Sequence, residues 1–371
     1  MKLKSFIYCS GLALTLAFTS AASQVETRGG AGALFTMDNA AAGNHVLAYG
    51  RAADGSLSSL GAFATDGLGT GDGLGNQGAL ILSSGGGWLF ACNAGSDEIS
   101  VFRVTPHGLQ LTDKVGSGGK RPISLAVHRN LLYVLNAGGL VGDADNVTAF
   151  LFSDGELSPL AGSTRPLSAA NTDSAQISFS PDGNVLVVTE KATGVIDTFT
   201  VNDDGLIDEQ QQFASVGQTP FGFAVRRDVL IVSEAFGGAP DASAVSSYEL
   251  ADDGSLQVIS PSVPTTETAA CWIVVTRNGH FAYASNTGSG TLSGYDVSSG
   301  GSLSLLNADG VTGLTGLGPI DMATSVNSHF LYALNSGDGT ISAFRVNHDG
   351  SLSSLPGVDG IPSGANGLAA R

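Results

Sequence analysis

Short apolar runs alternate with polar, glycine-rich turns along most of the chain. Near the C-terminus the pattern predicts four strands, over residues 320–325, 330–334, 340–346 and 352–355. Apolar and polar positions alternate imperfectly along 340–346, which is typical of strands with protein on both faces. Asp-Gly pairs between the runs favour tight hairpins because glycine accepts positive φ angles. The pattern therefore predicts antiparallel sheets of four strands.

One of these turns, usually written Asp-Gly-Ser-Leu, recurs seven times at intervals of 47 to 53 residues. The copies 54–60 and 349–355 are identical. The glycines of the seven copies are Gly55, Gly108, Gly155, Gly205, Gly254, Gly301 and Gly350. A repeat of this period, with strands between the copies, is typical of β-propellers. We therefore predict an all-β fold, a seven-bladed β-propeller of four-stranded blades.

The two ends of the chain are expected to complete the first blade. That blade lacks an inner strand from the N-terminal side, and segment 364–370 resembles segment 75–80, which enters blade two. We expect the C-terminal strand to fill the gap and close the ring, which removes open sheet edges. Residues 23–371 then form a single domain.

The first 22 residues have a different pattern. Lys2 and Lys4 precede an apolar run over 6–18, and the small residues 20–22 follow it. This arrangement predicts a cleaved secretory signal peptide rather than a membrane span. We expect a secreted or periplasmic protein whose mature chain keeps Cys92 and Cys271. These cysteines fall in blades two and six, too far apart for a disulfide, so both are expected to be free, buried thiols.

The net charge of −17 restricts the partners. An acidic surface of this kind repels nucleic acid and anionic membranes, and loss of Lys2 and Lys4 makes it more acidic still. Asp143, Asp145 and Asn146 have a calcium-like spacing, but the glutamate of a calcium-binding loop is absent. We predict a monomer with no metal and no cofactor, which binds a small polar or anionic ligand.

A polar position follows the second strand of six blades. It is occupied by Asn93, Asn136, Glu190, Glu234, Asn286 and Asn335. Asparagine there can cap a turn through its side chain. Glutamate caps turns poorly, and two carboxyl groups can divide acid and base roles when burial separates their pKa values. Glu190 and Glu234 are therefore the catalytic candidates, with a structural role for both left open.

The loops between blades bring further candidates to the same face as this polar position. Cations gathered on one face of an acidic protein favour an anionic ligand, although isolated solvated side chains remain the alternative. The predicted ligand-binding residues are Lys191, Arg165, Gln176, Arg121, Phe221, Asn136 and Asn286. The histidines 128, 280 and 329 belong to inner hairpins, which we place on the opposite face.

Segments 180–188 and 100–104, together with the repeated Asp-Gly-Ser-Leu turn, resemble the lactonase-type seven-bladed propellers. That family includes 6-phosphogluconolactonases and fungal carboxymuconate cycloisomerases. The resemblance implies a histidine in a middle blade, an Arg-His pair after a proline in the next, and a glutamate after that blade's second strand. Glu234 matches the glutamate, whereas Gln176 stands at the histidine and Phe221-Gly222 at the pair.

Two functions follow from these observations. The first is a secreted lactonase-like hydrolase that acts on a lactone or a sugar-acid-type ligand in carbohydrate metabolism. The second is a non-catalytic propeller that binds a ligand or a protein partner through the same face. Enzymatic activity is left open, because the family's His and Arg-His positions are not matched.

Overall fold

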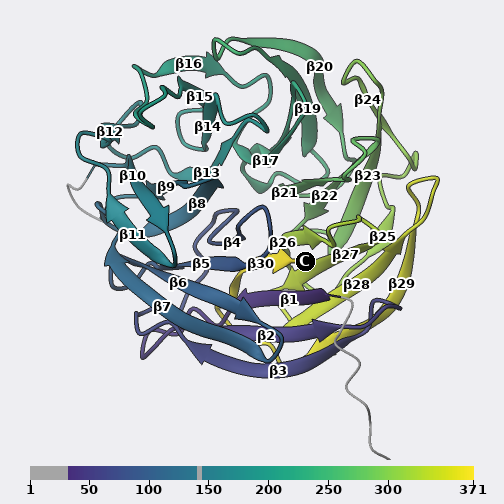
Figure 1. The fold of residues 1–371 in the computed structure, drawn as a ribbon. Helices are drawn as coiled ribbons and strands as arrows, with labels where there is room; N and C mark the ends of the chain where they lie inside the picture. The colour runs from purple at the N-terminus through teal and green to yellow at the C-terminus, as the bar shows by residue number, and fades with distance from the viewer. Residues whose placement is uncertain (1–31, 140–143) are drawn as a thin grey trace, which may run out of the picture.

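Seven β-sheets surround a central axis in the computed structural model (Figure 1), which describes residues 32–139 and 144–371. The predicted seven-bladed propeller is confirmed. The signal peptide and Asp143 lie outside the described residues, so the predictions made on them stay predictions. No helix in the described part of the chain is long and apolar enough to span a membrane.

The blades follow one another around the ring, and within each blade the strands run in order from the innermost outward. Blade one contains β30 (Asn366–Ala370), β1 (Gly32–Met37), β2 (His45–Arg51) and β3 (Leu57–Ala64). Blade two contains β4 (Leu80–Leu82), β5 (Trp88–Asn93), β6 (Glu98–Thr105) and β7 (Gly108–Gly116). Blade three contains β8 (Pro122–His128), β9 (Leu131–Asn136), β10 (Asn146–Ser153) and β11 (Glu156–Pro159), with β12 (Arg165–Pro166) paired to β10. Blade four contains β13 (Ser174–Phe179), β14 (Val185–Glu190), β15 (Val195–Thr200) and β16 (Gln211–Ala214).

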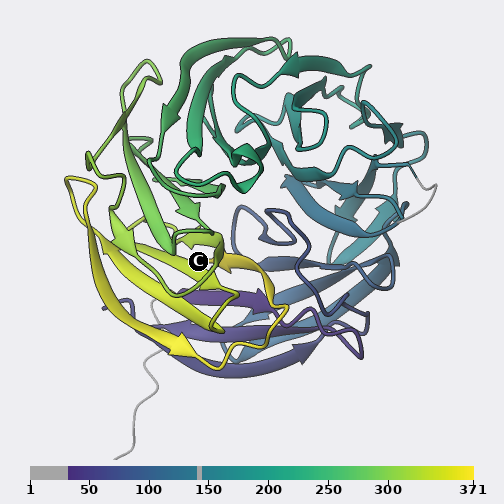
Figure 2. The ribbon, with the colours of Figure 1, turned by 180° about the vertical axis from the view of Figure 1, so that it is seen from behind.

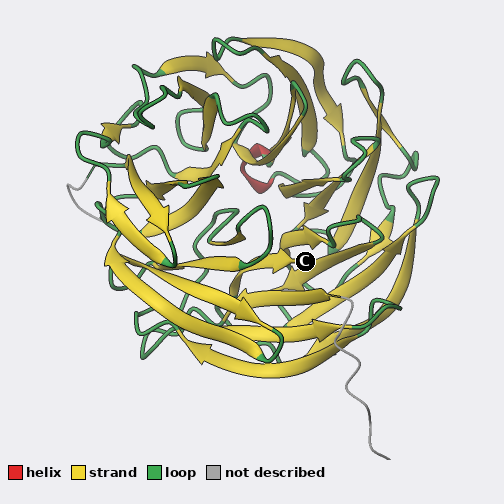
Figure 3. Ribbon diagram, viewed as in Figure 1, coloured by secondary structure: helices red, strands yellow, loops and turns green. Residues whose placement is uncertain are grey.

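The remaining three blades have the same order. Blade five contains β17 (Pro220–Arg226), β18 (Val229–Glu234), β19 (Ala244–Leu250) and β20 (Leu256–Pro264), with the 3₁₀ turn η1 (Phe236–Gly238) after β18 (Figure 3). Blade six contains β21 (Ala270–Val275), β22 (Phe281–Asn286), β23 (Thr291–Val297) and β24 (Leu303–Leu305), with β25 (Gly313–Leu314) paired to β23. Blade seven contains β26 (Pro319–Thr324), β27 (Phe330–Asn335), β28 (Thr340–Val346) and β29 (Leu352–Asp359).

The C-terminal strand closes the ring as predicted. β30 pairs antiparallel with β1, and Leu34 lies opposite Ala370. The backbone groups of Ala33 and Arg371 exchange two further hydrogen bonds, of 2.9 and 3.2 Å. The inner edge of β1 is therefore paired along its length, and the first and last segments of the described chain stabilise the same sheet.

The recurring glycine turn attaches each blade to the preceding one, which explains why it is repeated. All seven of its glycines have φ between 81° and 125°, a conformation that other residues rarely adopt. The carbonyl of Gly55 accepts a 2.9 Å hydrogen bond from the Tyr332 hydroxyl of blade seven, and Tyr283 of blade six reaches Gly350 in the same way. A Cβ at Gly55 would lie 2.4 Å from the ring of Phe330. The turn therefore needs glycine both for its backbone and for its fit against the neighbouring blade.

The ring has two different faces, seen from opposite sides in Figures 1 and 2. The second strand of each blade from two to seven ends on one of them, which we call the slot face after the polar position there. The hairpins that join first and second strands lie on the other, the hairpin face. Cys92 and Cys271 are buried and free, as predicted, and they belong to blades two and six.

Candidate functional site

The polar position at the end of the second strand is buried in blades two to seven. Asn136 and Asn286 are both wholly buried. The side-chain amide of Asn286 donates to the Ser293 hydroxyl of the third strand over 2.9 Å. A Cβ at Gly119, in the loop between blades, would lie 2.6 Å from Asn136 Cγ. These asparagines therefore connect the second strand, the third strand and the loop that enters the blade.

Glu234 occupies this position in blade five and has no exposed surface. Its carboxylate accepts hydrogen bonds from the Gly217 N–H at 2.9 Å, from the Ser262 hydroxyl at 2.6 Å and from the Ser246 hydroxyl. Burial raises the pKa of Glu234, and the three hydrogen bonds oppose that rise. Each donor comes from blade five or from the loop that leads into it.

Glu190, in blade four, is equally buried and accepts from the backbone N–H and the hydroxyl of Ser168 and from Thr193. On the adjacent strand β15 a second carboxyl, Asp197, lies opposite Val188, two residues before Glu190; blades five and six have a serine at this position. Burial first, and then Glu190, raise the pKa of Asp197 to about 9. Neither Asp197 oxygen has a hydrogen-bond partner of ordinary geometry among the described residues. This environment favours the protonated form of Asp197.

The predicted cation Lys191 directly follows β14 on the slot face. Its Nζ donates to the Gly75 carbonyl over 2.5 Å, lies 3.2 Å from the Asp173 carboxylate and sits 4.7 Å from the centre of the Phe221 ring. Burial lowers the pKa of Lys191, and Asp173 opposes that shift. The Phe221 and Trp272 rings lie 4.8 Å apart. We call these five residues the channel entrance.

A glycine-rich loop, residues 66–79, fills the space behind this entrance. In both views of the ring it curls over the middle, just before β4 (Figures 1 and 2). The Gln77 amide donates to the Ile273 carbonyl over 2.8 Å and accepts from the Ile273 N–H over 3.1 Å. The Gln77 N–H donates to Ala175, and its carbonyl accepts from Ser124. One residue of blade two therefore bonds to blades three, four and six.

The other predicted ligand-binding residues are distributed unevenly. Arg121 is half-buried close to Lys191, whose pKa it lowers slightly. Gln176 is buried, and its amide both donates to and accepts from the backbone of Phe223. Arg165 lies away from this group, because its guanidinium donates to carbonyls of its own turn and to Ile207.

The structure thus brings Lys191, Arg121, Gln176 and Phe221 towards the channel, and encloses Glu190 and Glu234 within their blades. No hydrogen bond or ion pair joins either glutamate to Lys191 within residues 32–139 and 144–371. The catalytic assignment of the two glutamates stays a prediction. Their contacts are those of residues that hold loops in place.

The profile of the family described as "Lactonase, 7-bladed beta-propeller" matches residues 140–238 and 241–363, more than half of the chain. The chain belongs to this lactonase family. A search of the curated proteins gives no match.

Solved structures similar to this lactonase-family propeller share its fold at low identity. The periplasmic gluconolactonase of Pseudomonas aeruginosa has a TM-score of 0.72 and 16% identity, over 91% of this chain and 98% of its own. A Bacteroides fragilis protein proposed to be a 6-phosphogluconolactonase has a TM-score of 0.70 and 18% identity, over 92% and 98%. A Lactobacillus plantarum protein has a TM-score of 0.72 and 18% identity, over 92% and 99%. At such identities the similarity shows the fold and not the activity.

The positions that the family resemblance marks for catalysis have other contacts in this lactonase-family propeller. Gln176, at the histidine position, is paired with backbone. Gly222, at the second position of the Arg-His pair, faces the loop, since a Cβ there would lie 2.1 Å from the Gln77 side-chain oxygen. A histidine at 222 and the Gln77 amide cannot occupy this space together.

Three buried polar residues of the site were not predicted from the sequence. Asp197 could have been found by aligning the third strands, where the corresponding residues of blades two, three, five, six and seven are Ser100, Thr148, Ser246, Ser293 and Ser342. Gln77 gives no local signal, because its partners are in other blades. Asp321 lies on the inner strand of blade seven, and burial raises its pKa to about 7 against hydrogen bonds from backbone N–H groups.

Proposed function

We propose that this protein is an exported, ligand-binding member of the lactonase family that does not hydrolyse lactones through the family's residues. The observation that supports this most directly is the Gln77 amide, which occupies the space over Gly222 and bonds to blade six across the channel. General acid–base catalysis needs a side chain within hydrogen-bond reach of the substrate. Gln176 and Glu234 have their hydrogen-bonding groups engaged with protein.

The experiment is a hydrolysis assay of the mature protein against a panel of lactones that includes δ-gluconolactone. A pH indicator measures the acid that hydrolysis releases. We expect rates equal to spontaneous hydrolysis for the wild type and for Glu234→Gln. Lactone turnover that disappears in Glu234→Gln would refute the proposal. Export is tested separately by N-terminal sequencing of the secreted or periplasmic protein, which we expect to begin near Ser23.

A second function, lactone hydrolysis, is favoured by one observation. Glu234 stands at the glutamate position of the family resemblance, and burial raises its pKa towards the range of a general acid or base. For this function the loop 66–79 must leave the channel. Glu234→Gln would then lower kcat/KM by about 100-fold, the usual scale for loss of an acid or base.

A further inference from the structure

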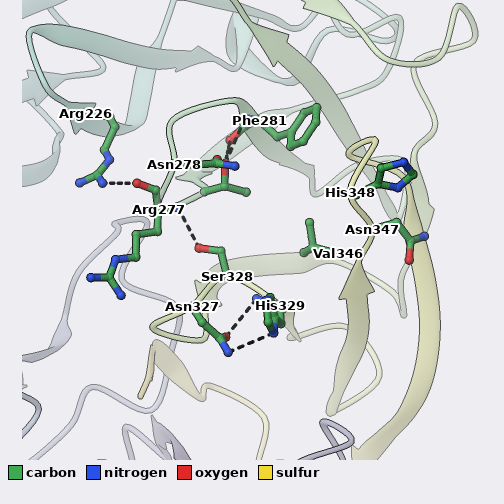
Figure 4. A pocket seen from close by; sticks show the side chains of 11 residues that line it. Arg226, Arg277, Asn278, Phe281, Asn327, Ser328, His329, Val346, Asn347 and His348 are labelled. Atoms are coloured by element: carbon green, nitrogen blue, oxygen red, sulfur yellow. Dashed lines mark hydrogen bonds between the residues drawn. The ribbon is translucent and has the colours of Figure 1, made fainter.

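A cavity of about 590 Å³ opens on the hairpin face, on the opposite side of the ring from the channel entrance (Figure 4). Its wall combines the end of β17, the inner hairpins of blades six and seven, and the turn after β28. Binding sites for small molecules usually measure roughly 300 to 1,000 Å³. The cavity is therefore large enough for a ligand of one sugar ring or slightly more.

The ionisable side chains that line the cavity are all arginines and histidines. Arg226 and Arg277 lie on one side and His348 on the other, with His329 between them in the view of Figure 4. No Asp or Glu of the described residues belongs to the lining. In a chain with a net charge of −17, a concave surface of this composition concentrates positive potential. Such a surface favours an anion.

The two arginines are held in position but keep donors available. Arg226 donates through one Nη to the backbone carbonyl of Arg277, and its buried Nε has no partner among the described residues. The N–H of Arg277 donates to the Ser328 hydroxyl over 2.8 Å, which fixes this hairpin against blade seven. The Arg277 guanidinium is exposed and makes no hydrogen bond or ion pair with any described residue. The planar fork of a guanidinium matches the two oxygens of a carboxylate.

The rest of the cavity wall is suited to the polyhydroxylated carbon chain or ring of a sugar derivative. Asn278 accepts hydrogen bonds from Thr276 and from the His280 N–H through its oxygen, which leaves its amide N–H groups as donors. The Phe281 ring adds an apolar face beside it (Figure 4). Sugars present both hydroxyl groups and apolar C–H faces. The lining therefore combines donors for hydroxyl groups with an apolar surface for C–H groups.

We propose that this cavity binds a small organic anion of the sugar-acid class, with its carboxylate on Arg226 and Arg277 and its hydroxylated body against Asn278, His329 and Phe281. The inference rests on the proposed ligand-binding function and assigns the ligand to the hairpin face rather than to the channel entrance. The cavity and the channel entrance share no residue, so each can be tested separately.

The test is isothermal titration calorimetry with D-gluconate at low ionic strength, with D-glucose as the neutral probe. We expect the wild type to bind gluconate and not glucose. Arg277→Gln should weaken gluconate binding by about tenfold or more, because charge-assisted bidentate hydrogen bonds are among the strongest in proteins. Arg129→Gln is the matched control, since Arg129 is an exposed residue of the corresponding hairpin in blade three. We expect it to bind gluconate like the wild type.

Two results would overturn the inference. Gluconate binding that is unchanged in both Arg277→Gln and Arg226→Gln would place the ligand elsewhere and leave the binding function intact. If the wild type binds neither gluconate, galacturonate nor inorganic phosphate, the cavity is not an anion-binding site. Lactone turnover that depends on Glu234 would instead refute the proposed function. Calorimetry on the same preparation then shows separately whether the cavity binds the anion.

Discussion

Replacing Asp197 by serine should make the protein more stable at neutral pH and less dependent on pH. Serine is the residue at the corresponding position of blades two, five, six and seven. In blade five that serine, Ser246, donates its hydroxyl to the carboxylate of Glu234. The substitution Asp197→Ser would give Glu190 the same donor and remove one of two facing carboxyl groups.

The size of the effect follows from the shifted pKa of Asp197. The pKa is about 9 in the folded protein, raised first by burial, against an ordinary value of 3.8. The folded state therefore holds its proton more tightly than the unfolded state. Asp197 costs no stability below pH 4, and the cost grows as the pH rises from about 4 towards 9. A shifted proton changes stability by about 1.4 kcal/mol per pH unit, so the wild type should lose roughly 3 kcal/mol between pH 5 and pH 7 from this group.

Serine brings a smaller cost, which is largest at low pH. It leaves a void of about 20 Å³, worth roughly 0.5 kcal/mol, and at low pH it loses the interaction of the protonated acid with Glu190, worth about 1 kcal/mol. The stability curves of the two proteins should therefore cross between pH 4 and pH 7. Asp197→Ser is expected to be the less stable protein at pH 4 and the more stable one at pH 7.

The assay is denaturant unfolding followed by fluorescence at pH 4, 5, 6 and 7, with midpoints and slopes compared at each pH. Asp203→Ser is the matched control, because Asp203 is an exposed carboxylate of the same blade with no hydrogen bond through its side chain among the described residues. Its curve should run parallel to that of the wild type. Parallel curves for Asp197→Ser and the wild type would refute the argument that Asp197 carries a proton in the folded state.

Three other predictions address the ring, the loop and the thiols. Removal of residues 366–371 should lower the melting temperature by about 10 °C or more in calorimetry, because it unpairs β1; an unchanged melting temperature would contradict the role of β30. Gly222→Ala should destabilise the protein by about 2 kcal/mol, since its Cβ would lie 2.1 Å from Gln77, whereas Gly73→Ala, with no atom within 4 Å, should melt like the wild type. Burial raises the pKa of Cys92 and raises that of Cys271 to about 11, so neither should react with a thiol reagent at pH 8 unless the protein is unfolded in guanidinium; fast reaction of the native protein would show that the core opens.

The fold was predictable from the sequence because each blade repeats the same glycine turn and the same strand pattern. The glycine turn must have positive φ and must fit against the preceding blade, so the same residues recur at the same spacing. Closure by residues 364–370 followed from counting strands, and β30 confirms it. The signals involved are local and periodic, which is what a single sequence shows best.

The candidate site was less predictable, because its residues are defined by contacts between distant segments. The sequence indicated that the polar position lies on the slot face, but not that its side chains are enclosed within the blades, as for Glu190 and Glu234. It drew Arg165 into the same group as Lys191, although the guanidinium of Arg165 bonds to its own turn. The burial of these side chains depends on loops that pack over them, and the loops vary from blade to blade.

Gly222 and the Gln77 amide fit together across the channel. Gly222 leaves a space on the inner strand of blade five, and the Gln77 amide fills it and satisfies the exposed backbone groups of Ile273. Glycine at 222 and the position of the Gln77 amide depend on one another. A side chain at 222 would exclude the amide, and glycine without the amide would leave a void and unpaired backbone groups. The inner strands of blades four and five keep their packing and hydrogen bonds with Gln176 and Phe221-Gly222 where the resemblance implies a histidine and an Arg-His pair.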